Sequence, residues 1–350
     1  MSRSETRGPR EASGLPSPPV SERGPAPMKK SPLVAPAVCA VVFAAPLAPQ
    51  EPRLQSMPVD PLVEVEWLLR HIGDEDVVVV EAERRPGEFA EEHIAGARPL
   101  RFQDITWEGD EGWIVEFPEV DELVDALRAA GIQRDSKVVI YGTSMTATAR
   151  TWVTFDFLGL GDRAFLLNGG IADWKAAGGP VESGEVPPIE PGDVAANSPV
   201  DFRVSADWVH ERLDHASVVL LDARPDDEYT GTDGGLGGTV NPGHIPGAAQ
   251  LYWEELMDPA NNTRFLPRDR ITRILERHGA GEGRTHVTYC MIGMRASVVY
   301  MAARMNGLDI LFYDGSWRDW GTRDDLPVET GPDPRDGRNN DWRRESPIRR

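Results

Sequence analysis

One short segment of the chain combines residue types that can do chemistry together. It consists of Cys290, Met291, Ile292, Gly293, Met294 and Arg295. The residues before it, His286–Tyr289, are typical of a buried strand, and Val298–Arg304 after it is typical of a helix. We therefore expect Cys290 at the end of a strand, in a loop that leads into a helix N-terminus.

This setting favours a reactive thiolate. Amide N–H groups in a tight loop and at a helix N-terminus converge on one atom and stabilise negative charge there. Gly293 permits the backbone angles that a curled loop needs, and Arg295 adds a permanent positive charge that can hold an anion. We predict that Cys290 is a nucleophile. The alternative is a small buried hydrophobic residue, which is common for free cysteines.

The elements around this loop belong to an internal repeat. The first copy contains, in order, the segments Val77–Val80, Glu92–Ala97, Lys137–Tyr141 and Leu166–Gly170. The second copy contains the matching segments Val218–Leu221, Gly243–Ala248, His286–Tyr289 and Leu311–Gly315. Because chance does not give several matches in the same order, the body of the chain is interpreted as a duplication.

Each copy alternates apolar strands with helical segments. This pattern predicts an α/β fold with two tandem domains, residues 60–180 and 204–330, each a parallel sheet flanked by helices on both faces. Residues 181–203 contain several prolines and are predicted to form an exposed linker. Ligands bind such sheets where strands end and helices begin, which places the expected site at the Cys290 loop.

The first copy lacks a cysteine at the matching position. It has Gly142 there, followed by Thr143 and Ser144. We therefore expect an inactive domain at residues 60–180 and a catalytic domain at residues 204–330.

The repeat and the cysteine loop together resemble the tandem-domain sulfurtransferases of the rhodanese family. In that family an inactive first domain precedes a domain that carries the active-site cysteine. The resemblance lies in Glu92–Ala97, Leu167–Trp174, Asp222–Arg224, Gly243–Ala248, Cys290–Arg295 and Tyr313–Trp317, which together span nearly the whole body of the chain. It implies two tandem rhodanese-like domains.

The resemblance also implies a chemistry that needs neither a metal nor an organic cofactor. The thiolate of Cys290 takes sulfur from a small anionic donor such as thiosulfate, and the persulfide passes it to a thiophile such as cyanide or a thiol. The loop residues Met291, Ile292, Gly293 and Met294 would bind the substrate, with their backbone forming the cradle.

Two arginines are candidates for holding the anionic donor. Arg295 closes the loop, and Arg224 follows the strand that ends at Asp222, at the same edge of the sheet. The alternative for Arg224 is a structural salt bridge to Asp222 or Glu228.

Several functions remain open. The bulky Met291 and Met294 differ from the small loop of mercaptopyruvate-type members, which favours thiosulfate, with 3-mercaptopyruvate as the alternative donor. A non-enzymatic persulfide carrier or sensor would use the same thiol. A cysteine phosphatase is disfavoured because only four residues separate Cys290 from Arg295 and Tyr289 precedes the cysteine.

Composition excludes other classes. A net charge of −20 argues against general nucleic-acid binding. The two cysteines, Cys39 and Cys290, exclude a disulfide scaffold and a cysteine-rich metal site, and the seven histidines show no ligand-like pairing. The sequence does not indicate an oligomeric state.

The ends of the chain are expected to lie outside the fold. Residues 1–27 are predicted to be disordered or to precede the true start. Residues 28–48 begin with Met28 and two lysines, continue with an apolar run, and are predicted to be an export signal, with a cytoplasmic protein as the alternative. No later segment approaches membrane length. Residues 331–350 are predicted to form a disordered tail.

Other notable residues are interpreted structurally. The glycine-rich insertion Gly231–Gly238 lacks the lysine of a phosphate-binding loop and is predicted to be a flexible surface loop. His93 and His244 occupy matched places in both copies, as do Trp174 and Trp320, so we expect structural roles for all four.

Overall fold

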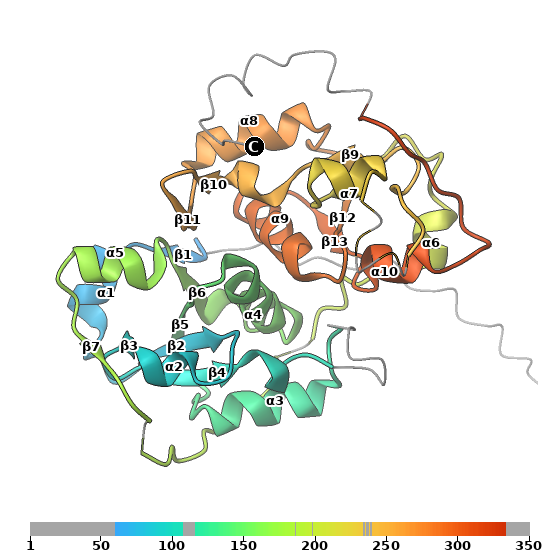
Figure 1. Ribbon diagram of the computed structural model, residues 1–350. Helices are drawn as coiled ribbons and strands as arrows, with labels where there is room; N and C mark the ends of the chain where they lie inside the picture. Colours follow the sequence, from blue (N-terminus) through green and yellow to red (C-terminus); the bar gives the residue numbers. More distant parts are fainter. Residues whose placement is uncertain are drawn as a thin grey trace, which may run out of the picture. The chain divides into compact units, whose positions relative to one another are not determined.

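The computed structural model describes residues 60–107, 116–185, 187–197, 199–233, 235, 238 and 240–333 (Figure 1). The predicted leader and export signal, residues 1–48, lie outside the described residues, as do residues 334–350. None of the helices within the described ranges has the length and apolarity needed to cross a bilayer.

The first domain is built on a five-stranded sheet. Its strand order is β1 (Leu62–Val63), β6 (Ala164–Leu167), β5 (Lys137–Tyr141), β2 (Val77–Glu83) and β4 (Arg98–Arg101), and every neighbouring pair is parallel. The helices are α1 (Val65–His71), α2 (Glu88–Glu91), α3 (Val120–Ala129), α4 (Met145–Phe157) and α5 (Gly170–Ala176), with short 3-10 turns η1 (Phe102–Asp104) and η2 (Gly161–Arg163). A two-stranded antiparallel pair, β3 (His93–Ile94) with β7 (Val181–Glu182), completes it.

Both faces of this sheet are covered by helices. Successive side chains of a strand point to opposite faces. Val78 and Val80 accordingly pack in one apolar cluster with residues of α3 and α4, while Val79 packs in another with residues of α1, α2 and α5. The continuous valine run is therefore buried on both sides, as predicted for a parallel strand.

The second domain repeats this plan. Its parallel sheet has the order β13 (Ile310–Phe312), β12 (Thr285–Tyr289), β8 (Val218–Asp222) and β9 (Ala249–Gln250). The helices are α6 (Ala206–His210), α7 (Asp226–Thr230), α8 (Arg268–Arg277), α9 (Met294–Met305) and α10 (Ser316–Gly321). A 3-10 turn, η4 (Trp253–Leu256), precedes an antiparallel hairpin, β10 (Met257–Asp258) with β11 (Asn261–Phe265), which the sequence did not predict. The predicted fold class is confirmed.

Matched residues of the two copies make matched contacts. The indole Nε1 of Trp174 donates to the carbonyl of Pro180 at 2.9 Å, and that of Trp320 donates to the carbonyl of Pro327 at 2.8 Å. Both tryptophans are fully buried. They anchor the turn after α5 and α10, so their role is structural.

The two matched histidines are also structural. His93 stacks on Phe89 and bonds its carbonyl at 2.8 Å, and His244 stacks on Tyr229 and bonds its carbonyl at 2.7 Å. Burial lowers the pKa of His244 below its ordinary value, which favours the neutral ring.

Parts of the predicted linker and of the predicted tail pack against the domains and form hydrogen bonds with them. Residues 181–182 form β7 of the first domain, and Val194 is buried and donates its N–H to the carbonyl of Ile132 at 3.2 Å. The tail prediction is wrong for its first residues, because Asp333 is buried and accepts a hydrogen bond from the backbone of Gln250 at 2.9 Å.

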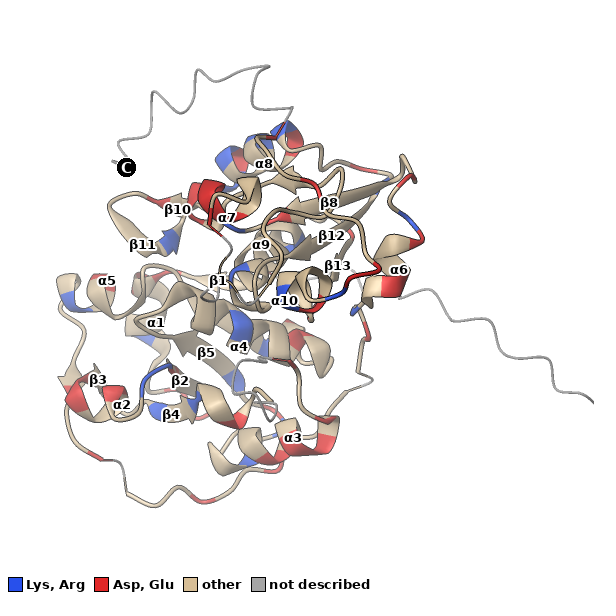
Figure 2. Ribbon diagram, turned by 45° about the vertical axis from the view of Figure 1, so that its right-hand side comes forward, with Lys and Arg blue, Asp and Glu red and all other residues tan. Residues whose placement is uncertain are grey.

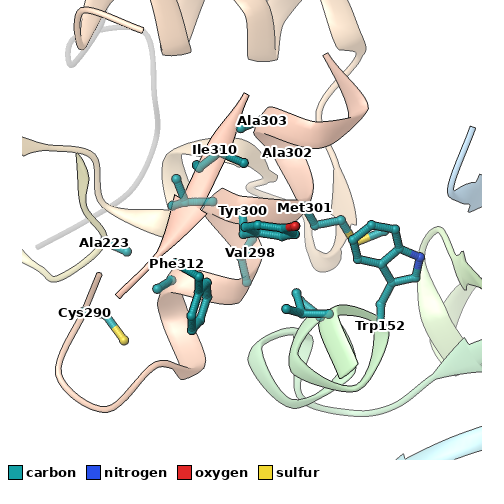
Figure 3. Close-up of a cluster of buried hydrophobic side chains, with 14 of the residues drawn as sticks. Trp152, Ala223, Cys290, Val298, Tyr300, Met301, Ala302, Ala303, Ile310 and Phe312 are labelled. Carbon is teal, nitrogen blue, oxygen red and sulfur yellow. The ribbon is translucent and has the colours of Figure 1, made fainter. Parts of the chain in front are cut away.

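The two domains meet along α4 and α9. Figure 3 shows Trp152 of α4 facing Met301 and Tyr300 of α9. The hydroxyl of Tyr300 donates to Asp156 Oδ2 at 2.8 Å, across the interface. The β10–β11 hairpin of the second domain also contacts the first domain. The backbone carbonyl of Thr263 in β11 accepts the N–H of Gly169 at 3.0 Å.

Candidate active site

Cys290 lies at the first position after β12, as predicted. Its side chain is fully buried, and the thiol is free. Figure 3 shows the sulfur within the curve of the loop that leads to α9. Gly293 ends that loop with a φ of 86°, in the left-handed region, and caps the N-terminus of α9. A strand, a curled loop and a helix N-terminus therefore surround the thiol, which is the arrangement that stabilises an anion.

Hydrogen bonds from the N-terminus of α10 hold the backbone of the cysteine loop. The carbonyls of Cys290 and Met291 accept the N–H groups of Trp317 at 2.9 Å and Arg318 at 3.0 Å. Ser316 Oγ accepts the N–H of Cys290 at 3.2 Å and donates to the carbonyl of Tyr313 at 3.0 Å. Ser316 itself has a φ of 55°, unusual for a residue with a side chain. The sequence of Tyr313–Trp317 gives no signal of this support, because the contact joins two loops that are far apart in the chain.

Arg295 lies beside the thiol but is paired with a carboxylate. Its two terminal nitrogens donate to the two oxygens of Glu228, each at 2.7 Å. Burial alone would lower the pKa of Arg295, but the hydrogen bonds to Glu228 and the charge of Cys290 raise it overall. Glu228 belongs to α7, the acidic helix in Figure 2. The guanidinium is thus held in place next to Cys290 with its charge partly compensated.

Arg224 has the geometry of the structural alternative. It is 1% exposed and forms a bidentate ion pair with the buried Asp222, with nitrogen–oxygen distances between 2.6 and 3.1 Å. Its second terminal nitrogen also donates to the carbonyl of Gly243 at 2.8 Å, and its guanidinium lies 4.6 Å from the centre of the Trp317 ring. These contacts tie the end of β8 to neighbouring loops, so we assign Arg224 a structural role.

The apolar loop side chains are covered from two sides. Met291 is buried, and a Cβ added at Gly235 would lie 2.3 Å from its methyl carbon. Gly235 belongs to the insertion predicted to be a flexible surface loop. Thr232, Asp233 and Gly238 of that insertion are exposed, but Gly235 is buried against Met291. Met294 packs with Phe102 of the first domain, and Ile292 packs against the same cluster. The first domain therefore forms part of the wall beside the loop.

The matching loop of the first domain has no room for a cysteine. A Cβ added at Gly142 would lie 2.7 Å from Thr148 Oγ1 and 3.2 Å from the carbonyl oxygen of Ala82. The loop is also one residue shorter, since Ser144 caps α4 where Gly293 caps α9. A cysteine at position 142 would therefore not fit this loop in its present conformation.

The fold and site are those of a protein with two tandem α/β domains, in which Cys290, the one cysteine among the described residues, lies at the end of a strand. Residues 64–177 and 205–323 match the family model of the rhodanese-like domain. The chain belongs to this family, as the sequence analysis anticipated.

Named relatives cover most of the chain. A probable 3-mercaptopyruvate sulfurtransferase of Pseudomonas aeruginosa is 32% identical over 257 residues, 69% of this chain and 86% of the relative. A thiosulfate sulfurtransferase of Corynebacterium glutamicum is 28% identical over 288 residues, 77% of this chain and 90% of the relative. The crystal structure of YnjE is similar with a TM-score of 0.70 and 26% identity, covering 81% of this chain and 72% of that one.

Proposed function

We propose that the chain is a sulfurtransferase that carries sulfur as a persulfide on Cys290. The observation that carries the proposal is the free thiol at the end of β12, inside a loop capped by Gly293 at the N-terminus of α9. The names of the relatives support sulfur transfer as the reaction class.

The reaction has two half-reactions. The Cys290 thiolate attacks the outer sulfur of thiosulfate, a new S–S bond forms, and sulfite leaves with the electron pair of the broken S–S bond. A thiophile such as cyanide then attacks the outer sulfur of the persulfide. Thiocyanate forms, and the electron pair returns to the Cys290 thiolate.

The residues around Cys290 stabilise the anionic sulfur of each state. The positive end of α9 faces the loop, and Arg295 adds a positive charge that Glu228 holds in position. Because Arg224 is committed to Asp222, Arg295 is the arginine that we propose to act on the donor.

Thiosulfate is the proposed donor, and 3-mercaptopyruvate is the alternative. The Corynebacterium relative is named for the first donor and the Pseudomonas relative for the second. Thiosulfate is favoured because the bulky Met291 and Met294 differ from the small loop that is expected of mercaptopyruvate-type members.

Intact mass tests the proposal. Thiosulfate should add one sulfur, about 32 Da, and cyanide should remove it with release of thiocyanate. Cys290→Ser should not load sulfur. Cys39→Ser in the unprocessed full chain, which retains residues 1–48, is the matched control and should load like the wild type. Full loading of Cys290→Ser would refute the proposal. The ratio of kcat/KM for thiosulfate and 3-mercaptopyruvate then assigns the donor.

We further propose that the protein is exported through a signal that begins at Met28. The lysines and apolar run at residues 28–48 support this. N-terminal sequencing of the mature protein should find a start after this run, and an intact residue 29 or 30 would contradict export.

A further inference from the structure

A buried ion pair joins the first domain to the support of the cysteine loop. Arg150 of α4 is fully buried, and its Nη1 lies 2.8 Å from Oδ1 of Asp314, which follows β13 of the second domain. The other oxygen of Asp314 accepts the N–H of Phe117 at 3.0 Å. Both carboxylate oxygens of Asp314 are therefore held by the first domain.

This ion pair packs directly against Gly293. A Cβ added at Gly293 would lie 3.0 Å from Asp314 Oδ1 and 3.3 Å from Arg150 Nη1. Asp314 also lies two residues before Ser316, which accepts the N–H of Cys290. The ion pair thus lies against Gly293, the last residue of the cysteine loop. It is also close in the chain to Ser316, which bonds Cys290, the first residue of that loop.

The surroundings make this pair rigid. The Arg150 guanidinium lies 3.6 Å from the centre of the Phe117 ring and 5.4 Å from that of Phe312. A charge buried among apolar rings cannot leave its partner without losing most of its stabilisation. A buried, well-bonded network of this kind specifies a single arrangement of the groups that it contacts.

We propose that Arg150 and Asp314 are positioning residues for the Cys290 loop. The first domain lacks a nucleophile, and through this pair it holds Gly293 and the N-terminus of α9 in the conformation that stabilises the anionic sulfur. This role concerns the proposed sulfur transfer, and the loading rates below can be measured only if the protein carries out that reaction. The first domain would then contribute to catalysis through this ion pair, in addition to packing against the second domain.

The test removes both charges together, because a single substitution would leave a buried charge without its partner. Arg150→Met/Asp314→Asn keeps the volume of the arginine stem and an oxygen that can accept the N–H of Phe117. Tyr300→Phe is the matched control, since it removes another hydrogen bond between the two domains, from α9 to Asp156 of α4. Tyr300 lies seven residues beyond Gly293, about 10 Å along the helix.

The rate constant for sulfur loading from thiosulfate is measured by quenched-flow mass spectrometry, with thermal unfolding of each variant. The double variant should fold and load sulfur about tenfold more slowly or worse, whereas Tyr300→Phe should load at the wild-type rate. Arg150→Lys should load faster than the double variant because it retains the charge. A double variant that loads within twofold of the wild type would overturn the inference.

Alkylation of Cys290 by iodoacetamide gives a readout that does not depend on any donor. The rate of alkylation is measured as a function of pH from the mass of the peptide that contains Cys290. The midpoint of the profile should move to higher pH in the double variant and stay in place in Tyr300→Phe. If the wild type loads no sulfur, the proposed function fails, and the alkylation profiles still decide the role of the pair. Superimposed profiles would refute it.

Discussion

Replacement of Gly293 by alanine is the sharpest test of how the cysteine loop is built. The residue has a φ of 86°, where a side chain costs about 1–2 kcal/mol of folding free energy. The new methyl group would also lie 3.0 Å from Asp314 Oδ1 and 3.3 Å from Arg150 Nη1. Because both neighbours are buried and paired, they cannot move aside freely, and such overpacking costs about 1–3 kcal/mol. We expect Gly293→Ala to lose about 2–5 kcal/mol in total.

Gly307→Ala separates the two contributions. Gly307 follows α9 and has a φ of 73°, but a Cβ added there would meet no atom within 4 Å. It should lose only the backbone contribution, about 1–2 kcal/mol. Urea unfolding of both variants measures the difference between them, and sulfur loading measures the effect on the site.

The expected result is that Gly293→Ala is the less stable variant and loads sulfur at least about tenfold more slowly, while Gly307→Ala loads normally. Equal losses of stability in the two variants would refute the contact of Gly293 with the ion pair. Normal loading by Gly293→Ala would refute the role of the loop conformation.

Three further predictions follow from named contacts. Arg295→Met should slow sulfur loading by about tenfold or more, because it leaves the negative charge of Glu228 beside the thiol without compensation, and unchanged single-turnover loading would contradict this. Burial raises the pKa of Glu81 to about 7, so the protonated carboxyl is favoured in the folded state. Stability should therefore fall as pH rises from about 4.5 to about 7, and urea unfolding of Glu81→Gln should show a flatter pH profile. Gly142→Ala should destabilise the protein by about 1–3 kcal/mol, because its methyl group meets Thr148 Oγ1 at 2.7 Å, and an unchanged urea midpoint would contradict the steric account.

The sequence alone determined the local features of this protein. The strand Val77–Val80 was predicted from four consecutive β-branched residues, and His286–Tyr289 from its match to Lys137–Tyr141 in the first copy. They lie within β2 and β12. The duplication followed from segments that recur in order, and the position of Cys290 followed from the strand before it and the helix after it. The strand and the cysteine position depend on neighbours along the chain, and the duplication depends on the order of recurring segments, so all three can be recognised from the sequence.

Only the tertiary structure decided which charges meet. Arg224 and Arg295 were both candidates for the donor in the sequence, with a salt bridge to Asp222 or Glu228 as the alternative for Arg224. The fold buries Arg224 with Asp222 and pairs Arg295 with Glu228. Arg150 carried no signal, because its partner Asp314 is 164 residues away in the chain and belongs to the other domain. Ion pairs between distant residues depend on how helices and loops pack, and local periodicity contains no information about that packing.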